Sequence, residues 1–264
     1  MSNPFVDDFH LTIFNSFIMI LCFPIFFIRF VFFSITLITL LFHYSLFNIN
    51  NDMIKKYSRL LIYIVGFQVN IHNFEPNNLS QIIISNHSLL FDSFLLSAYI
   101  SNSCYIASSW IKNIPIISKI HLLSGGFYVD RKRKNNLTQI IKNKLDSVEY
   151  SNKHLIIYAE GTITNNNSLI NFRSSAFTFK KPISPVFIKY NYNNFGISNN
   201  IFLCLYRIFI LPNKKVDIYF NNLYNPTFEE LNNAEYYKNN FRILYAKNNN
   251  LSLFDNNFND AKIY

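Results

Sequence analysis

The hydrophobic pattern divides the chain into one long apolar stretch and a longer part in which short apolar runs alternate with polar segments. Between residues 9 and 51, Arg29 is the only residue of the Asp, Glu, Lys and Arg types, and residues 11–47 are almost continuously apolar. A helix needs about 20 residues to cross a bilayer. The pattern therefore predicts a membrane-embedded helical segment that precedes the remaining chain.

Two arrangements of this apolar stretch agree with the pattern. Pro24 and Arg29 interrupt it, so two half-length helices that dip into one leaflet are one possibility. The competing arrangement is one tilted span with an amphipathic extension. Arg near the centre of a bilayer costs about 2.5 to 3.5 kcal/mol on insertion scales, so Arg29 is expected to reach toward the interface in that case.

Basic residues follow the apolar stretch directly, at positions 55, 56 and 59. Cationic residues next to a membrane segment favour the cytosolic side, so the following domain is expected to face the cytosol. We divide the chain into a membrane-anchoring segment, residues 1–54, and a second domain, residues 55–264.

After residue 60, apolar runs of strand length alternate with segments of helical periodicity, which is typical of an α/β fold. The predicted strands are 67–72, 81–85, 104–107, 127–129, 154–158, 186–190 and 216–220. Apolar residues recur at helical spacing over 137–148, which predicts a surface helix that covers a sheet. The expected fold is a mixed sheet flanked by helices.

Composition supports contact with a membrane. Half of the residues are hydrophobic, 18% are aromatic and 15% are charged, which suggests that apolar surface meets something other than a protein core. The net charge of +9 suits nucleic acid, an anionic membrane or a phosphate-bearing substrate. No zinc-finger or aromatic RNA-binding signature accompanies the dispersed cations, so nucleic acid is not an expected partner.

Metal and cofactor chemistry find no support in the pattern. The six histidines form no HExxH motif and the three cysteines form no CxxC pair, which are spacings that zinc sites commonly use. We therefore expect no metal and no bound cofactor.

The segment Asn86-His87-Ser88-Leu89-Leu90-Phe91-Asp92 follows a predicted strand directly. His87 can accept a proton from a hydroxyl near neutral pH, and Asp92 can fix its tautomer and stabilise the cation. The five-residue spacing requires a turn between the two side chains. Taken alone, the segment favours a structural interpretation, in which His87 ends a strand and Asp92 caps a helix. Ser88 lacks the GxSxG context of a serine nucleophile, which disfavours a serine hydrolase.

Three further blocks follow in order: GGFYVDR at 125–131, YAEGTIT at 158–164 and KPISPV at 181–186. Glycine permits tight turns, and Arg131 presents a planar fork of donors suited to phosphate oxygens. Together with NHSLLFD at 86–92, these blocks resemble the four ordered blocks of the glycerophospholipid acyltransferases, NHxxxxD, GxxFIxR, FPEGT and a proline-rich block before a strand. The resemblance extends over roughly residues 55 to 260.

The resemblance implies roles for individual residues. His87 and Asp92 match the catalytic dyad, and the acceptor-phosphate positions match Gly125, Arg131, Glu160, Gly161 and Thr162. Residues 160–177 are particularly similar to the lysophosphatidylcholine acyltransferase branch, in which a Leu-Ile-x-Phe segment ends in a basic residue, here Arg173. The helix around residues 236–247 also resembles that branch.

The implied activity is transfer of a fatty acyl group from acyl-CoA, as co-substrate, to the free hydroxyl of a lysophospholipid at a membrane. The expected location is the endoplasmic reticulum or another endomembrane. Ala159 and Tyr128 depart conservatively from the family pattern, whereas Ile163 stands where many members that form phosphatidic acid carry Arg. A lysophosphatidylcholine-like acceptor is therefore favoured. The alternatives are a 1-acylglycerol-3-phosphate acyltransferase and a non-catalytic membrane lipid-binding protein.

Overall fold

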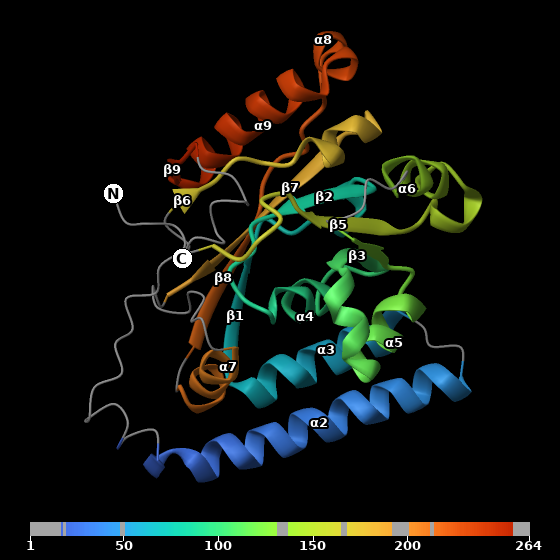
Figure 1. The fold of residues 1–264 in the computed structure, drawn as a ribbon. Coiled ribbons are helices and arrows are strands. Elements are labelled where there is room, and N and C mark those ends of the chain that lie inside the picture. Colours follow the sequence, from blue (N-terminus) through green and yellow to red (C-terminus); the bar gives the residue numbers. More distant parts are fainter. Residues whose placement is uncertain are drawn as a thin grey trace.

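A computed structural model describes residues 17, 20–47, 51–130, 137–164, 168–191, 201–211 and 214–255. A seven-stranded sheet forms its central layer (Figure 1). In spatial order the strands are β1 (Phe67–His72), β8 (Lys214–Phe220), β7 (Ile183–Tyr190), β2 (Ile82–Ser85), β5 (His154–Tyr158), β3 (Ser103–Ser108) and β4 (Phe127–Val129). Neighbouring strands are parallel except for the antiparallel pair β7 and β8. The predicted mixed sheet is confirmed, and each predicted strand agrees to within three residues.

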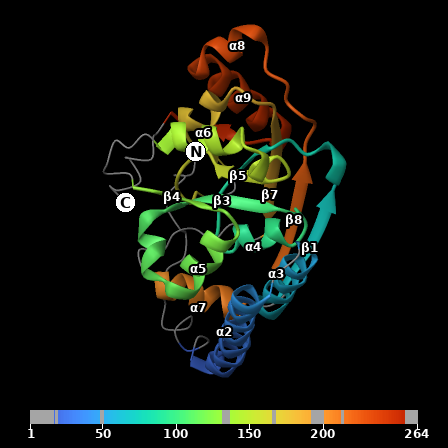
Figure 2. The ribbon, with the colours of Figure 1, turned by 90° about the vertical axis from the view of Figure 1, so that its right-hand side faces the viewer.

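Helices cover both faces of this sheet (Figure 1 and Figure 2). One face carries α2 (Phe23–Leu46), α3 (Asn51–Val65), α4 (Asp92–Ser97), α5 (Pro115–Leu123) and α7 (Ile201–Ile210). The other face carries α6 (Leu137–Leu145), α8 (Phe228–Asn232) and α9 (Ala234–Asn249). Short 3-10 turns are η1 (Pro76–Asn78), η2 (Ser109–Asn113), η3 (Val148–Tyr150) and η4 (Ser174–Phe179), and β6 (Ser168–Leu169) pairs with β9 (Ser252–Leu253) in a separate small sheet.

The apolar runs in the central strands reflect burial on both sides. Ile83 and Ile156 point into the cluster beneath α3 and α4, whereas Ile82, Ile84 and Ile157 point into the cluster beneath α6 and α9. Successive strand residues alternate between faces, and here both faces are covered, so the strands read as continuous apolar runs.

Two predicted boundaries differ from the structure for local reasons. β7 begins at Ile183 and includes Pro185, whose carbonyl oxygen accepts a hydrogen bond from the Asn221 backbone. The nitrogen of Pro185 therefore faces Asn221, which lies just after the end of β8. A proline, which has no N–H to donate, is tolerated at this position. The predicted helix 137–148 ends at Leu145, because Ser147 has an extended backbone.

Of the two arrangements that the pattern allowed, the one with a break at Arg29 is not seen in the described part of the apolar stretch. α2 runs through Arg29 as one helix, and Pro24 lies in its first turn, where a missing N–H is harmless. The Arg29 guanidinium donates hydrogen bonds to the carbonyl oxygens of Phe209 and Leu211 at the C-terminal end of α7. A cation there is stabilised by the helix dipole. Arg29 thus binds protein and has no need to reach for the membrane interface.

α2 lies along the domain and exposes most of its apolar surface. The rings of Phe26 and Tyr206 are in tilted contact with centroids 4.6 Å apart, and Phe33 packs on Phe91 at 5.6 Å. Near the far end of α2, His43 is hydrogen-bonded to the Tyr57 hydroxyl. By length and composition, α2 is a helix that could cross a membrane. A window of 18 residues in it has a mean hydropathy of 2.4, and 17% of that window is buried in the protein. α3 continues through residue 55, so the predicted domain boundary falls inside a helix.

Candidate active site

The end of β2 is anchored to β7 by Asn86. The Asn86 side-chain amide donates to the carbonyl oxygen of Ile188 and accepts from the Ile188 N–H, each at 2.8 Å. The Tyr245 hydroxyl accepts from the Asn86 N–H and donates to the carbonyl of Val186. These bonds continue the strand pairing beyond the last strand residue, so the backbone from which His87 projects is rigidly placed.

His87 and Asp92 are brought together by the turn that their spacing requires. The Asp92 N–H donates to the Leu89 carbonyl at 3.2 Å, and α4 begins at Asp92. His87 Nδ1 lies 2.8 Å from Asp92 Oδ2. The same oxygen accepts the backbone N–H groups of Ser88 and Leu89, at 2.7 and 3.0 Å. This fully buried carboxylate is therefore held in one orientation toward the imidazole.

A second tyrosine completes the environment of the carboxylate. The Tyr190 hydroxyl, from the end of β7, donates to Asp92 Oδ1. A nearby anion and burial both penalise ionisation of this phenol, so the pKa of Tyr190 lies well above its ordinary value, with burial the larger cause. Tyr190 therefore stays protonated and acts as a permanent donor to Asp92.

The imidazole of His87 is oriented on its other side by Tyr158. The two rings stack with centroids 4.2 Å apart and planes 12° from parallel. Because a carboxylate only accepts hydrogen bonds, Nδ1 carries the proton, which leaves Nε2 with the lone pair. No described residue hydrogen-bonds Nε2, and 21% of the side chain is exposed. The arrangement can take a proton from a hydroxyl that approaches Nε2.

Glu160 lies behind this arrangement and does not line the site. Its side chain is 1% exposed, and its carboxyl group accepts hydrogen bonds from the Thr164 hydroxyl and the Ile170 N–H. Thr164 N–H in turn donates to the carbonyl of His87 at 2.8 Å. In this structure the Glu160 carboxyl group lies behind the loop that supports His87, and its part in binding an acceptor phosphate stays a prediction.

Burial raises the pKa of Glu160 from 4.5 to about 8, against the lowering effect of its hydrogen bonds. Between about pH 5 and pH 8 the Glu160 carboxyl group is ionised in the unfolded chain but still protonated in the folded protein. The free energy of unfolding should therefore fall as pH rises through this window, by on the order of 4 kcal/mol. Glu160→Gln should remove that slope, as measured by denaturant unfolding in detergent at both ends of the window.

The matched control for this experiment is Glu149→Gln, which changes an exposed carboxylate. It should leave the pH slope of the wild type intact. An identical slope in the wild type and in Glu160→Gln would contradict the assignment of a buried, protonated Glu160.

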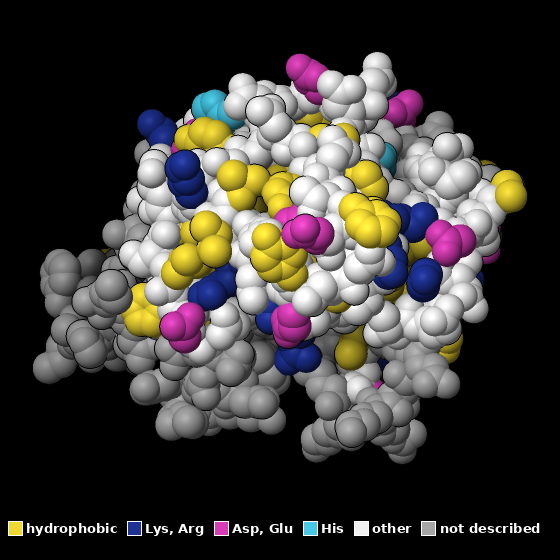
Figure 3. All heavy atoms as spheres, turned by 90° about the horizontal axis from the view of Figure 1, so that it is seen from above, with side chains coloured by type: hydrophobic (Ala, Val, Ile, Leu, Met, Phe, Trp, Pro, Cys, Tyr) yellow, Lys and Arg dark blue, Asp and Glu magenta, His cyan; other side chains and the backbone are white. Residues whose placement is uncertain are grey.

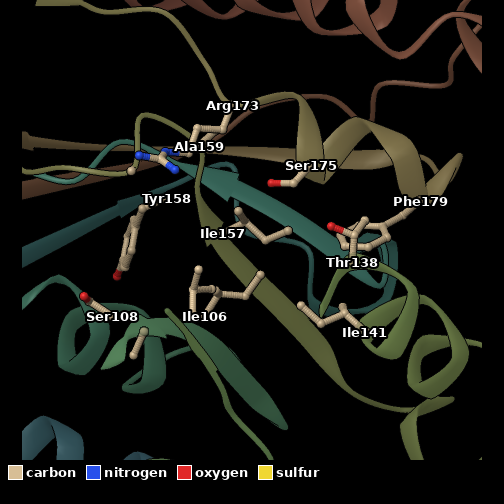
Figure 4. A pocket seen from close by; sticks show the side chains of 13 residues that line it. Ile106, Ser108, Thr138, Ile141, Ile157, Tyr158, Ala159, Arg173, Ser175 and Phe179 are labelled. Carbon is tan, nitrogen blue, oxygen red and sulfur yellow. The ribbon is translucent and has the colours of Figure 1, made fainter. Parts of the chain in front are cut away.

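A cavity of about 140 Å³ opens beside Tyr158 at the carboxyl ends of the central strands (Figure 4). It is lined by Ile106, Ala107, Ser108, Val129, Thr138, Ile141, Ile157, Tyr158, Ala159, Gly161, Arg173, Ser175 and Phe179. Arg173 and four side chains with hydroxyl groups lie among otherwise apolar walls. The cavity can thus hold a group with one anionic or polar end and an apolar body.

Gly161 is required by the approach of Arg173. Gly161 has φ +72°, and a Cβ at this position would lie 2.3 Å from Arg173 Nε. The Arg173 N–H donates to the carbonyl of Ala159, and burial lowers the pKa of the guanidinium. The structure therefore brings Gly161 and Arg173 together at the cavity. Thr162 follows in the same loop and is partly buried.

Gly125 lies apart from His87, and its contact with the acceptor stays a prediction. It precedes β4, and a Cβ there would lie 2.5 Å from the Lys153 amine; the Tyr150 hydroxyl donates to the Gly125 carbonyl. Both neighbours precede β5, so Gly125 is at the amino ends of parallel strands, opposite His87. Its φ of +87° serves a turn into β4. Arg131 lies outside the described residues.

The sequence pattern did not identify Asn86, Tyr158 and Tyr190 as site residues. The Asn86 position was visible as part of the first block, and Tyr158 ends a predicted strand, but Tyr190 is 98 residues from Asp92. Within the described residues, no group of three or more His, Cys, Asp or Glu side chains could hold a metal ion.

Comparison with known proteins finds acyltransferases among the proteins that this chain resembles. A family model described as Acyltransferase matches residues 67–189. A lysophosphatidylcholine acyltransferase of Drosophila melanogaster is 28% identical over 191 residues, and the lysophospholipid acyltransferase LPEAT1 of Arabidopsis thaliana is 27% identical over 192 residues. These alignments cover 68% and 69% of this chain but 35% and 48% of the relatives. The chain thus matches between about a third and a half of the relatives' own length.

A 1-acyl-sn-glycerol-3-phosphate acyltransferase of Cocos nucifera is 29% identical over 133 residues, which are 48% of this chain and 43% of the relative. Among solved structures, the 1-acyl-sn-glycerophosphate (LPA) acyltransferase PlsC from Thermotoga maritima matches with a TM-score of 0.62. That match covers 88% of this chain and 96% of the other at 17% identity. At this identity the likeness establishes the fold.

Proposed function

Because residues 67–189 form a domain of the acyltransferase family, we propose that the protein transfers a fatty acyl group from acyl-CoA to the free hydroxyl of a lysophospholipid. The observation that carries the proposal is the pairing of His87 Nδ1 with a buried Asp92 carboxylate at 2.8 Å. This pairing leaves Nε2 as a base, and Tyr158, on which the His87 ring stacks, lines a cavity that also contains the cationic side chain of Arg173.

In the proposed reaction, His87 Nε2 takes the proton from the acceptor hydroxyl as its oxygen attacks the thioester carbonyl carbon. The C–O bond forms, and collapse of the tetrahedral intermediate breaks the C–S bond. The imidazolium then returns its proton to the departing CoA thiolate, so the protons balance. Asp92 stabilises the imidazolium throughout, and no acyl-enzyme intermediate is required.

We propose a phosphodiester acceptor, such as lysophosphatidylcholine, in preference to lysophosphatidic acid. A phosphomonoester carries between one and two negative charges near neutral pH and is best met by several cations, whereas a phosphodiester carries one. Ile163 supplies no charge, and Arg173 supplies one at the cavity. Lys181 is engaged elsewhere, since its amine pairs with Asp146 at 2.8 Å. The names of the relatives include both acceptor types.

Ile163→Arg is expected to shift acceptor preference toward lysophosphatidic acid by about tenfold, because it adds a second cation beside the loop that carries Gly161. The measurement is the ratio of kcat/KM for lysophosphatidic acid to that for lysophosphatidylcholine. Ile163→Met, which keeps an uncharged side chain of similar volume, is the control and should leave the ratio unchanged. A wild-type preference for lysophosphatidic acid that neither variant alters would contradict the charge argument.

We propose that α2 holds the protein on the cytosolic face of an endomembrane, such as the endoplasmic reticulum. α2 packs along the domain and exposes Phe23, Phe27, Phe32 and Phe42 by 54% to 58%. The face on the other side of the molecule mixes cationic, anionic and apolar side chains, as a water-facing surface does (Figure 3). A helix bound along its length to the domain is best placed in the interfacial plane of one leaflet.

A non-catalytic lipid-binding protein is the alternative from another class. Incubation of the purified protein with acyl-CoA and a panel of lysolipids separates the two, because an acyltransferase consumes the thioester only when an acceptor is present. Binding of lysolipid without release of free CoA thiol would rule out the proposed function.

A further inference from the structure

The connection between β3 and β4 exposes an unusual number of large apolar side chains. It comprises η2 and α5, and we call residues 109–123 the η2–α5 segment. Trp110, Ile114, Leu122 and Leu123 expose 45%, 39%, 54% and 39% of their surface. Clustered exposure of this kind marks an interaction surface, whereas isolated apolar residues do not.

The exposed residues of α5 share one helical face. Pro115, Lys119, Leu122 and Leu123 are exposed and follow the spacing i, i+4, i+7 and i+8. The opposite face turns toward the protein, where His121 is buried and contacts the Phe127 carbonyl. α5 thus has an apolar stripe on its outward face as well as apolar side chains on its inward face. A helix whose outer face meets water is usually polar on that face.

This stripe lies next to the exposed surface of α2. α5 packs against α2, and the two helices lie on the same side of the sheet (Figure 2). Two helices that pack together thus both expose large apolar side chains, which include Leu122 and Leu123 on α5. Because α5 packs against a helix that could enter a membrane, a lipid bilayer is the partner best placed to cover the apolar stripe of α5.

The charges of the η2–α5 segment suit an anionic lipid surface. Lys112 and Lys119 are exposed, and the sequence has no Asp or Glu between Asp92 and Asp130. Lysine side chains place their amines at headgroup level while their stems cover apolar surface, and tryptophan is enriched at the same depth. Juxtamembrane cations also gain attraction from anionic lipids.

Resting on the proposed function, we propose that the η2–α5 segment is a second membrane-contacting element, which seats in the interface of an anionic bilayer beside α2. Ser108, directly before this segment, lines the cavity beside Tyr158. The segment then forms the edge over which a lysolipid passes from the bilayer to the site. The acceptor reaches His87 without leaving the interface.

Trp110 is the chain's single tryptophan, so it reports directly on this contact. The full-length protein is mixed with vesicles of phosphatidylcholine and phosphatidylglycerol whose acyl chains carry bromine, with unbrominated vesicles as the reference. Brominated chains should quench the indole emission by roughly twofold, and vesicles should shield it from aqueous acrylamide. An indole that stays open to acrylamide and insensitive to bromine, on protein that floats with the vesicles, would overturn the proposal.

The variant Leu122→Glu combined with Leu123→Glu places two charges on the stripe, and its matched control is Val148→Glu. Val148 is 92% exposed in η3, away from α2. The double variant should weaken vesicle binding, and activity on lysolipid presented in bilayers, by about tenfold, whereas the control should change neither. Activity in detergent micelles should stay at the wild-type level in both, which verifies folding.

Equal bilayer binding and activity in the double variant and the control would also refute the proposal. A wild-type protein that transfers no acyl group in micelles would refute the proposed function instead. The quenching of Trp110 involves no turnover, so it decides the membrane contact in either case.

Discussion

Replacing His87 by alanine is expected to lower kcat for acyl transfer by about 10²- to 10⁴-fold, the usual contribution of a positioned general base. The substitution removes Nε2, the nitrogen that accepts the hydroxyl proton, and the ring that stacks on Tyr158. His87 is partly exposed and belongs to neither apolar cluster of the described residues, so the fold should persist. The measurement is acceptor-dependent release of CoA thiol, with unfolding followed in parallel.

The chain offers a matched control in a second histidine–aspartate pair. His72 Nε2 lies 3.0 Å from Asp217, and its ring stacks on Tyr219 at 4.4 Å. This pair occupies β1 and β8, which are three and two strands from β2, the strand that His87 follows. His72→Ala should retain nearly full activity. Comparable losses in the two variants, or a His87→Ala enzyme with more than about a tenth of the wild-type kcat, would contradict the assignment of the base.

The sheet is predictable from the sequence because its signals are local. Strands buried on both faces must be short apolar runs, and residues 82–84 and 155–157 are such runs, so their positions follow from the sequence. The two-residue strands β6 and β9 carry no such signal, because they are too short for a period to be visible. Where the partner is distant, prediction fails: the Arg29 side chain binds carbonyl groups 180 and 182 residues away.

The residues of the candidate site also differ in how far the sequence predicts them, according to whether their partners are near or distant in the chain. The pairing of His87 and Asp92 depends on one turn and can be inferred from their spacing. The donor from Tyr190 depends on which strand lies beside β2, which spacing does not reveal. Glu160 and Gly125 belong to recognisable blocks, yet one is buried behind the loop and the other lies at the opposite edge of the sheet. A motif thus locates a segment without telling which way each side chain faces.

Asp92→Asn is the second large effect, with an expected fall in kcat of roughly 10²-fold or more. The two backbone N–H groups that bind Oδ2, from Ser88 and Leu89, require an oxygen at that position. The asparagine must therefore turn its oxygen toward them and its amide nitrogen toward the Tyr190 hydroxyl, which can accept. His87 Nδ1 keeps an acceptor, and its ring keeps its orientation.

What Asp92→Asn removes is the negative charge that stabilises the imidazolium as the hydroxyl proton is taken. The loss should hence appear in kcat, with KM for both substrates nearly unchanged. Tyr190→Phe is the matched control: it deletes the donor to Oδ1 but keeps the carboxylate, so kcat should fall by less than about tenfold. If Asp92→Asn instead turns over like the wild type, Asp92 acts only as an acceptor for the turn before α4, and the charge has no part in catalysis.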